Sequence, residues 1–409
     1  MTAPSTTAAN TPGTAGGVTT PQGFRAAGVS AGIKAKGLDL ALVVSDTPAT
    51  AAAVFTINKA QAAPVVVSRE HLERSGGVAR AIIVNSGCAN ACTGDDGMTV
   101  ARGMASETAR LVACPDEQVL VASTGVIGVN LSIAKVKSGL PLAYAALASD
   151  QGPLAARAIM TTDPFPKEAA VRITIDGHEV AIGGMCKGSG MIEPMMATML
   201  GFLTTDAAVP SALLQRALKE SARDTFNAIT VDGDGSTNDS LYAMASGASG
   251  VTIDDESYPA LHEALLTVSR ELAVGIVRGG EGATKLIAVN VHDAQSRDEA
   301  RQVARTIANS PLVKTAVHGA DPNWGRIVAA AGRSGVHFDI NRVTVHIGGI
   351  LLFENGLPHD EASPQAGEYL RNADVRIDVS LGTGGGAGAT IWTCDLSAEY
   401  VRINGEYRS

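Results

Sequence analysis

Short runs of apolar and largely β-branched residues recur along the chain, and most of them end at Gly, Asn or Asp. They occupy residues 38–46, 51–57, 79–87, 284–293, 342–356, 374–382 and 389–405. β-branched side chains favour pleated positions, and Gly, Asn and Asp favour the turns that follow them. These runs are therefore predicted to be strands of buried sheets.

Between the strand-like runs, apolar residues recur at the three- to four-residue spacing of a helix face. Helices are predicted at residues 99–114, 211–226, 258–277 and 296–310. Ser211, which follows Pro210, is the predicted N-cap of the second helix, and Ser296 or Asp298 is that of the last. The alternation of strands and helices predicts a layered α/β protein. A chain of 409 residues is expected to form two domains or lobes.

Residues 1–17 have a different composition from the rest of the chain. They are mainly Thr, Ala, Pro and Gly, without charge and without an apolar period. Such a segment cannot bury enough apolar surface to offset the entropy of ordering it. We expect a disordered extension, with the folded chain beginning at Val18.

Charge and cysteine content exclude several classes of protein. The formal net charge is −9, and aromatic residues make up 4% of the chain, which argues against a nucleic-acid surface. Cys88 and Cys92 lie four residues apart, but no second Cys or His pair stands near them in the sequence, so no metal site is expected. The five cysteines, an odd number, are typical of a reducing compartment. No run of about 18 apolar residues and no secretory leader are present, which predicts a soluble, cytoplasmic protein without membrane partners.

The most unusual segment is residues 185–206, where a Gly-rich turn leads through Pro194 into an apolar run. Thr198 is one of its few polar residues. A Thr at the start of a strand is usually a structural β-branched residue. Its hydroxyl becomes a nucleophile when a base removes the proton, and the α-amine of the same residue can do so once the bond after Ala197 is cut. The pKa of an α-amine, near 8, suits that role close to neutral pH.

At this segment the sequence KGSGMIEPMMATML resembles the processing site of the ornithine acetyltransferase family, whose members cleave an Ala-Thr bond in their own chain. Further blocks follow in the family's order: VTTPQGFRAAGVSAGIK, NSGCANACTG, VASTGVIG, AIMTTDPFPK, DGDGSTND, GGEGATK, HGADPNWGR and YVRINGEYRS. The resemblance covers residues 18–409. It implies an α/β sandwich of the self-processing aminopeptidase and ornithine acetyltransferase type, which is N-terminal-nucleophile-like. It also implies an α chain of residues 18–197, a β chain of residues 198–409, and a heterotetramer of two of each.

The resemblance implies roles for individual residues. Thr198 is the nucleophile and, with Ala197, flanks the cleaved bond. Thr124 and Gly125 match the pair that forms an oxyanion hole, although on their own they could be an ordinary Thr-Gly turn. The residues that match substrate-binding positions are Thr161 or Thr162, between which the match does not choose, Lys187, Thr198, Glu281, Asn404 and Ser409.

The function implied by the resemblance is acyl transfer without a cofactor, in arginine biosynthesis. Acetyl would pass from N2-acetyl-L-ornithine to Thr198 and then to L-glutamate, which makes the protein a glutamate N-acetyltransferase. Whether acetyl-CoA is also a donor stays open. Two alternative functions remain open. One is a self-processed aminopeptidase or amidase, in which water is the acceptor. The other is an uncleaved binding protein that holds amino acids between Lys187 and Glu281.

Three other motifs are weaker candidates. Residues 232–239 resemble a calcium loop but have Thr237 at the sixth place and Ala243 at the twelfth, so they are predicted to be a polar turn near the site. The Gly-rich run at residues 382–390 leads into a strand, which is atypical of a nucleotide site. His318 could act as a base, but a lone His beside a turn is more often structural.

Overall fold

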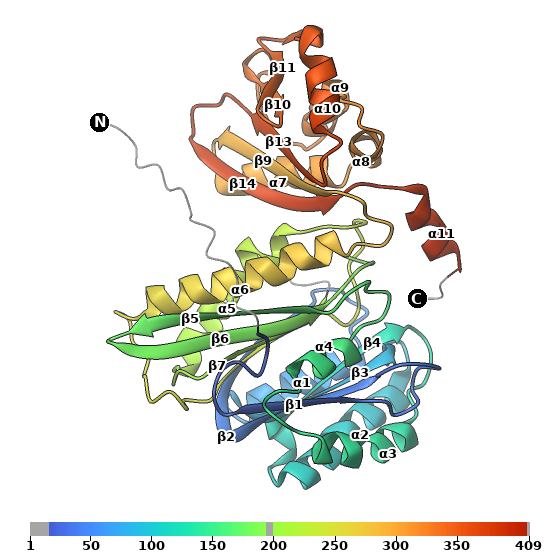
Figure 1. Cartoon of the computed structure of the whole chain (residues 1–409), viewed down its shortest axis with the longest axis vertical. Helices are drawn as coiled ribbons and strands as arrows, with labels where there is room; N and C mark the ends of the chain where they lie inside the picture. Colours follow the sequence, from blue (N-terminus) through green and yellow to red (C-terminus); the bar gives the residue numbers. More distant parts are fainter. Residues whose placement is uncertain (1–15, 194–198, 407–409) are drawn as a thin grey trace.

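The computed structural model describes residues 16–193 and 199–406, so most of the predicted extension lies outside the described residues. The chain forms two sheets with helices packed on them, and Figure 1 shows the unit built on the smaller sheet above the larger one. The predicted layered α/β class is confirmed. Within those two ranges, no helix combines the length and the apolarity needed to cross a membrane.

The larger sheet has eight strands in the order β4-β3-β2-β8-β7-β6-β5, with β1 paired to β2. The strands are β1 Phe24–Val29, β2 Leu40–Phe55, β3 Val78–Cys88, β4 Val119–Val126, β5 Lys167–Ile175, β6 His178–Lys187, β7 Leu200–Thr205 and β8 Ser240–Ala245. In β3, Ile82 and Val84 enter one apolar cluster, and Ala81 and Ile83 enter another. Because alternate side chains point to opposite faces, both faces of this sheet are buried.

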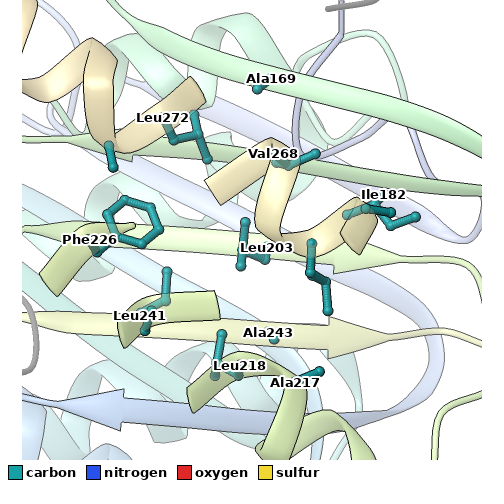
Figure 2. Close-up of a cluster of buried hydrophobic side chains, with 14 of the residues drawn as sticks. Ala169, Ile182, Leu203, Ala217, Leu218, Phe226, Leu241, Ala243, Val268 and Leu272 are labelled. Atoms are coloured by element: carbon teal, nitrogen blue, oxygen red, sulfur yellow. The ribbon is translucent and has the colours of Figure 1, made fainter. Parts of the chain in front are cut away.

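Among the described residues, six helices pack on the larger sheet. They are α1 Ala63–Arg74, α2 Gly94–Val112, α3 Ile133–Ala145, α4 Gly152–Ala158, α5 Ser211–Asp224 and α6 Tyr258–Arg278, with short 3₁₀ turns at η1 Asp116–Gln118 and η2 Phe226–Ala228. Figure 2 shows Leu218 of α5 and Leu272 of α6 over Leu203 and Leu241 of the sheet. This apolar layer stabilises the central strands, whose ends contribute to the site described below.

The smaller sheet has the strand order β12-β11-β10-β13-β9-β14. Its strands are β9 Leu286–Ala294, β10 Thr344–Ile347, β11 Ile350–Glu354, β12 Leu357–Pro358, β13 Asp374–Ser380 and β14 Ala387–Cys394. The helices of this half are α7 Arg297–Ala308, α8 Pro311–His318, α9 Trp324–Gly332, α10 Ser363–Tyr369 and α11 Ala398–Glu406, with 3₁₀ turns at η3 Ile340–Arg342 and η4 Asp360–Ala362. This sheet and its helices form a second apolar core.

The two units are joined at α6 and at Ile229, which follows η2. Figure 1 shows α6 lying between the larger sheet and the smaller unit. Arg278, at the end of α6, makes a two-bond ion pair with Asp374 of β13, with distances of 2.6 and 2.9 Å. Ile229 forms a β-bridge with Trp392 of β14. These contacts fix the smaller unit beside the strand ends that form the site.

Three details of the sequence prediction were wrong. The runs at 38–46 and 51–57 form the single strand β2, which pairs with β1 in its first half and with β8 in its second. The predicted strand at 389–405 ends at Cys394, and residues 398–406 form α11, because a short apolar run does not by itself distinguish a strand from a helix. Pro210 occupies the N-cap position of α5, so Ser211 is the first helical residue and makes no capping bond. The predicted cap at Ser296 is confirmed, since it accepts a bond from the Glu299 amide.

Candidate active site

All seven described candidate residues line one cavity of about 340 Å³. They are Thr124, Gly125, Thr161, Thr162, Lys187, Glu281 and Asn404. The remaining candidates, Ala197, Thr198 and Ser409, lie outside the described residues. Met199 and Leu200, which follow Thr198 in the sequence, also line the cavity.

Thr124 and Gly125 lie near the end of β4, where this strand runs parallel to β3. Gly125 has φ of +132°, and a Cβ atom there would lie 2.3 Å from the carbonyl carbon of Gly87. Both the backbone angle and the close approach of β3 therefore require glycine. The Thr124 hydroxyl accepts a hydrogen bond of 3.2 Å from Lys187 Nζ, so the hydroxyl of Thr124 and the cation of Lys187 meet beside the backbone of Gly125.

Lys187 and Glu281 supply opposite charges to the cavity. They are 9% and 7% exposed, so neither is an ordinary solvated surface charge. Asn404 of α11 donates a 2.8 Å hydrogen bond to Glu281 Oε2. A Cβ atom on Gly190 would lie 2.3 Å from the same oxygen, so the chain passes close to this carboxylate. A ligand with both a carboxylate and an ammonium group matches these charges.

The predicted polar turn at residues 232–239 lies at the site, as expected. Asp232 uses its oxygens to accept hydrogen bonds from the Met191 and Ile192 amides, at 2.6 and 2.7 Å. Asn238 donates to the carbonyl oxygens of Ala89 and Ser123, at 2.6 and 2.8 Å. The turn therefore holds the segment before the predicted cleavage site on one side and the ends of β3 and β4 on the other.

His318 is not among the residues that line this cavity in the described part of the chain. Its Nδ1 atom lies 2.7 Å from Asp395 Oδ2. Asp395 also accepts hydrogen bonds from the Thr284 and Lys285 amides, at 2.7 and 2.8 Å. This arrangement favours the structural interpretation of His318.

Comparison with known proteins identifies the family. The ArgJ family model matches residues 25–409. The chain belongs to the ArgJ family.

Relatives of this ArgJ chain match it along almost its whole length. The arginine biosynthesis bifunctional protein ArgJ of Dehalococcoides mccartyi (strain CBDB1) is 50% identical over 398 residues, which cover 96% of this chain and 97% of that protein. The protein of the same name from a Synechococcus strain is 50% identical over 405 residues, with the same two coverages.

Two solved structures are also similar to this chain. The arginine biosynthesis bifunctional protein argJ of Bacillus halodurans is 44% identical with a TM-score of 0.50, and the match covers 51% of this chain and 100% of that one. The ornithine acetyltransferase of Mycobacterium tuberculosis, complexed with ornithine, is 43% identical with a TM-score of 0.42, covering 44% of this chain and 96% of that one.

Asp163 is a buried residue beside the cavity that the sequence analysis missed. Its carboxylate accepts hydrogen bonds from Lys167 Nζ at 2.6 Å, the Gly188 amide at 2.8 Å and the Thr161 amide at 3.0 Å. Burial by itself raises the pKa of Asp163, but the charges of Lys187 and Lys167, together with the hydrogen bonds from Lys167 and the Gly188 amide, lower it to about 2. The signal in the sequence was its place in MTTDPFPK, beside the two candidate threonines and four residues before a lysine.

Proposed function

We propose that this ArgJ-family protein transfers acetyl from N2-acetyl-L-ornithine to L-glutamate in arginine biosynthesis, with Thr198 as the nucleophile. The observation that carries the proposal is the cavity, which collects all seven described candidates from distant parts of the chain. Met199 and Leu200 line it, so the strand that Thr198 precedes in sequence begins at the site.

The first step of the proposal is cleavage of the chain between Ala197 and Thr198, which frees the α-amine of Thr198. That amine then removes the proton from the Thr198 hydroxyl. The match to the Bacillus halodurans structure supports this step, because that whole chain corresponds to 51% of this one. Such a match is expected when a relative consists of two chains, each about half as long as this one.

In the transfer itself, the Thr198 oxygen attacks the acetyl carbonyl carbon, and the carbonyl oxygen becomes negatively charged. The hydroxyl of Thr124 and the backbone N–H of Gly125 stabilise this charge, and Lys187 stands 3.2 Å from the Thr124 hydroxyl. The C–N bond breaks, ornithine leaves with the proton, and an acetyl ester of Thr198 remains. The amine of glutamate attacks this ester, releases Thr198 and leaves as N-acetyl-L-glutamate.

Both amino acids use one site in this proposal because they share the α-amino acid part of their structure. Lys187 attracts a carboxylate, and Glu281, held by Asn404, attracts an ammonium group. Thr161 or Thr162 and Ser409 complete the set of substrate contacts. Acetyl-CoA is a further donor to be tested, and no cofactor takes part.

The assembly in this proposal is a tetramer of two α chains, which end at Ala197, and two β chains, which begin at Thr198, in the cytoplasm. Support for association of the fragments comes from the sheet, in which β7 and β8, from after the cut, lie between β2 and β6, from before it. Separation of the fragments would expose the buried central strands β7 and β8 to water.

The decisive variants are Thr198→Ala and Thr198→Ser. The wild type should run as two roughly half-length bands on denaturing electrophoresis and should transfer acetyl from acetylornithine to glutamate. Thr198→Ala should stay a single inactive band, because it has no hydroxyl to start cleavage. Thr198→Ser should still be cleaved, since it keeps the hydroxyl.

Two results would contradict the proposal. Active protein without any fragment that begins Thr-Met-Leu-Gly, by N-terminal sequencing, excludes Thr198 as the exposed nucleophile. Rapid hydrolysis of acetylornithine without transfer to glutamate identifies an amidase instead. Assays with acetylornithine and with acetyl-CoA as separate donors then determine whether the protein uses both.

A further inference from the structure

The C-terminal helix α11 contributes to the cavity through polar contacts. None of its nine described residues is buried, and Val401 is 68% exposed. Yet Tyr400 and Asn404 of this helix both line the cavity. Figure 1 shows α11 beside the main body of the molecule, at the end of the segment that leaves β14. Because a helix without a fully buried residue gains little from apolar packing, its specific side-chain bonds contribute much of what places it.

Three hydrogen bonds connect α11 and the residue before it to the site. Tyr400 donates its hydroxyl to Asp232 Oδ2 at 3.2 Å, and Asn404 donates to Glu281 Oε2 at 2.8 Å. Ser397, just before the helix, donates to the Gly282 carbonyl at 2.6 Å. A Cβ atom on Gly282 would lie 2.5 Å from the Tyr400 amide nitrogen, so the start of α11 sits directly on this turn.

Asp232 also holds the segment that leads towards the cleavage site. It accepts the Met191 and Ile192 amides with both of its oxygens. Met191 has φ of +57°, a left-handed conformation that a residue with a side chain adopts at a cost. The Val231 amide and the Thr230 hydroxyl bond to the Ile192 carbonyl, at 2.8 and 3.1 Å. Asp232 therefore stabilises an unfavourable bend beside the cavity.

Tyr400 is suited to donate to this carboxylate. Burial and the carboxylates of Asp232 and Glu281 raise the pKa of the Tyr400 hydroxyl, so it keeps its proton at neutral pH. A hydrogen bond to a charged acceptor is stronger than one between neutral groups. The phenol thus links α11 to the same carboxylate that fixes residues 191 and 192.

We propose that Asp232 and Tyr400 are positioning residues, whose hydrogen bond fastens α11 to the bend at Met191 and so places Asn404 and Glu281 to bind the amino acid substrates. The proposal rests on the proposed function for the identity of those substrates. It predicts that the Asp232–Tyr400 hydrogen bond affects substrate binding more than the chemical step, because neither residue needs to touch the reacting acetyl group.

Tyr400→Phe is the main test, because it removes one oxygen and keeps the ring. We expect the KM for acetylornithine and for glutamate to rise about fivefold, the effect of losing one hydrogen bond, while kcat changes by less than about twofold. Tyr144→Phe makes the same chemical change at an exposed position of α3 and should leave both constants unchanged.

Limited trypsin digestion provides a readout that needs no substrate. Arg402 lies in α11, and cleavage after it removes residues 403–409, which intact-mass measurement detects. Tyr400→Phe should be cut there about five times faster than the wild type, because α11 leaves the surface more often. Tyr144→Phe should be cut at the wild-type rate.

Asp232→Asn tests whether the two residues act together. It should raise the KM values as Tyr400→Phe does, and it should also slow self-cleavage, because the bend at residues 191 and 192 loses its anionic acceptor. The double variant should have KM values close to those of Asp232→Asn alone, since both changes remove the same hydrogen bond.

Unchanged KM values in Tyr400→Phe, an unchanged rate of cleavage at Arg402, or fully multiplicative effects in the double variant would each overturn the proposal. Failure of the proposed function gives a different result, namely wild-type protein that stays one band and transfers no acetyl group. The trypsin comparison still tests the Asp232–Tyr400 hydrogen bond in that case.

Discussion

Asp163 illustrates how one buried charge organises several parts of the site. Its side chain is fully buried, and its partner Lys167 is 2% exposed. The carboxylate connects the Thr161 segment after α4, the start of β5 at Lys167, and Gly188 after β6. A buried carboxylate stays charged when cations and several hydrogen bonds compensate for lost hydration, and Asp163 has both.

Asp163→Asn should destabilise the protein by roughly 3 kcal/mol at pH 7, because it leaves Lys167 buried without its counter-charge. The pKa of Asp163 in the fold, about 2, lies below its ordinary value of 3.8. Its charge therefore stabilises the fold above about pH 4, and this contribution is lost as the pH falls towards 2. Urea denaturation of the wild type and of Asp163→Asn, at pH 7 and at several pH values below 4, measures the difference between their free energies of unfolding. This difference should become smaller in acid.

Asp46→Asn is the matched control for this substitution. Asp46 pairs with Arg25 at 2.8 Å, but both side chains are about half exposed. Its loss should cost less than about 1 kcal/mol. The role assigned to Asp163 is contradicted if Asp163→Asn is as stable as this control. It is also contradicted if the loss in free energy of unfolding is the same in acid as at pH 7.

At the scale of single elements, the sequence predicted one helix cap correctly and another incorrectly. Ser296 and Ser211 each stand at the start of an amphipathic helix and are equivalent in sequence terms. In the structure Ser296 has an extended backbone and accepts the Glu299 amide at 3.2 Å. Pro210 takes the cap position of α5, so the hydroxyl of Ser211 has no capping role.

Ser296→Ala should lower the free energy of unfolding by about 1 kcal/mol, since the Glu299 amide loses its acceptor. Ser211→Ala should change it by less than about 0.5 kcal/mol, because no capping bond is lost at that position. Chemical denaturation of both variants under the same conditions measures the difference. Equal losses in the free energy of unfolding of the two variants would show that the geometry of the cap does not determine how much each serine stabilises the protein.

The whole molecule depends on strands from both sides of the predicted cut. β7 pairs with β6 on one side, while β8 pairs with β2 on the other, and β7 and β8 pair with each other. β6 and β2 come before residue 198, and β7 and β8 come after it. The larger sheet is therefore shared between the two predicted fragments.

Cleaved protein should elute from a sizing column at the same volume as uncleaved Thr198→Ala, because the hydrogen bonds and apolar cores of both sheets remain intact. The two fragments should separate only in denaturant. Fragments that elute apart under native conditions would contradict the shared sheet. The absolute elution volume of both samples also tests the proposed tetramer.

The sequence by itself determined the layered α/β class and the positions of the main strands and helices, and it supplied the list of candidate site residues. Periodicity and turn residues act over a few positions, and motif blocks can be matched in order without coordinates. The cap of α7 and the polar turn at 232–239 were predicted correctly for the same reason. Ala197, Thr198 and Ser409, which lie outside the described residues, remain predictions.

Only the tertiary structure decided which strands join and which side chains meet. Lys187 reaches Thr124 across 63 residues of sequence, and Asn404 reaches Glu281 across 123. No local pattern encodes such contacts, because they depend on how the sheets and helices pack. The same is true of α11, which was predicted to be part of a strand, and of Asp163, whose importance depends on burial and on lysines that the fold brings to it.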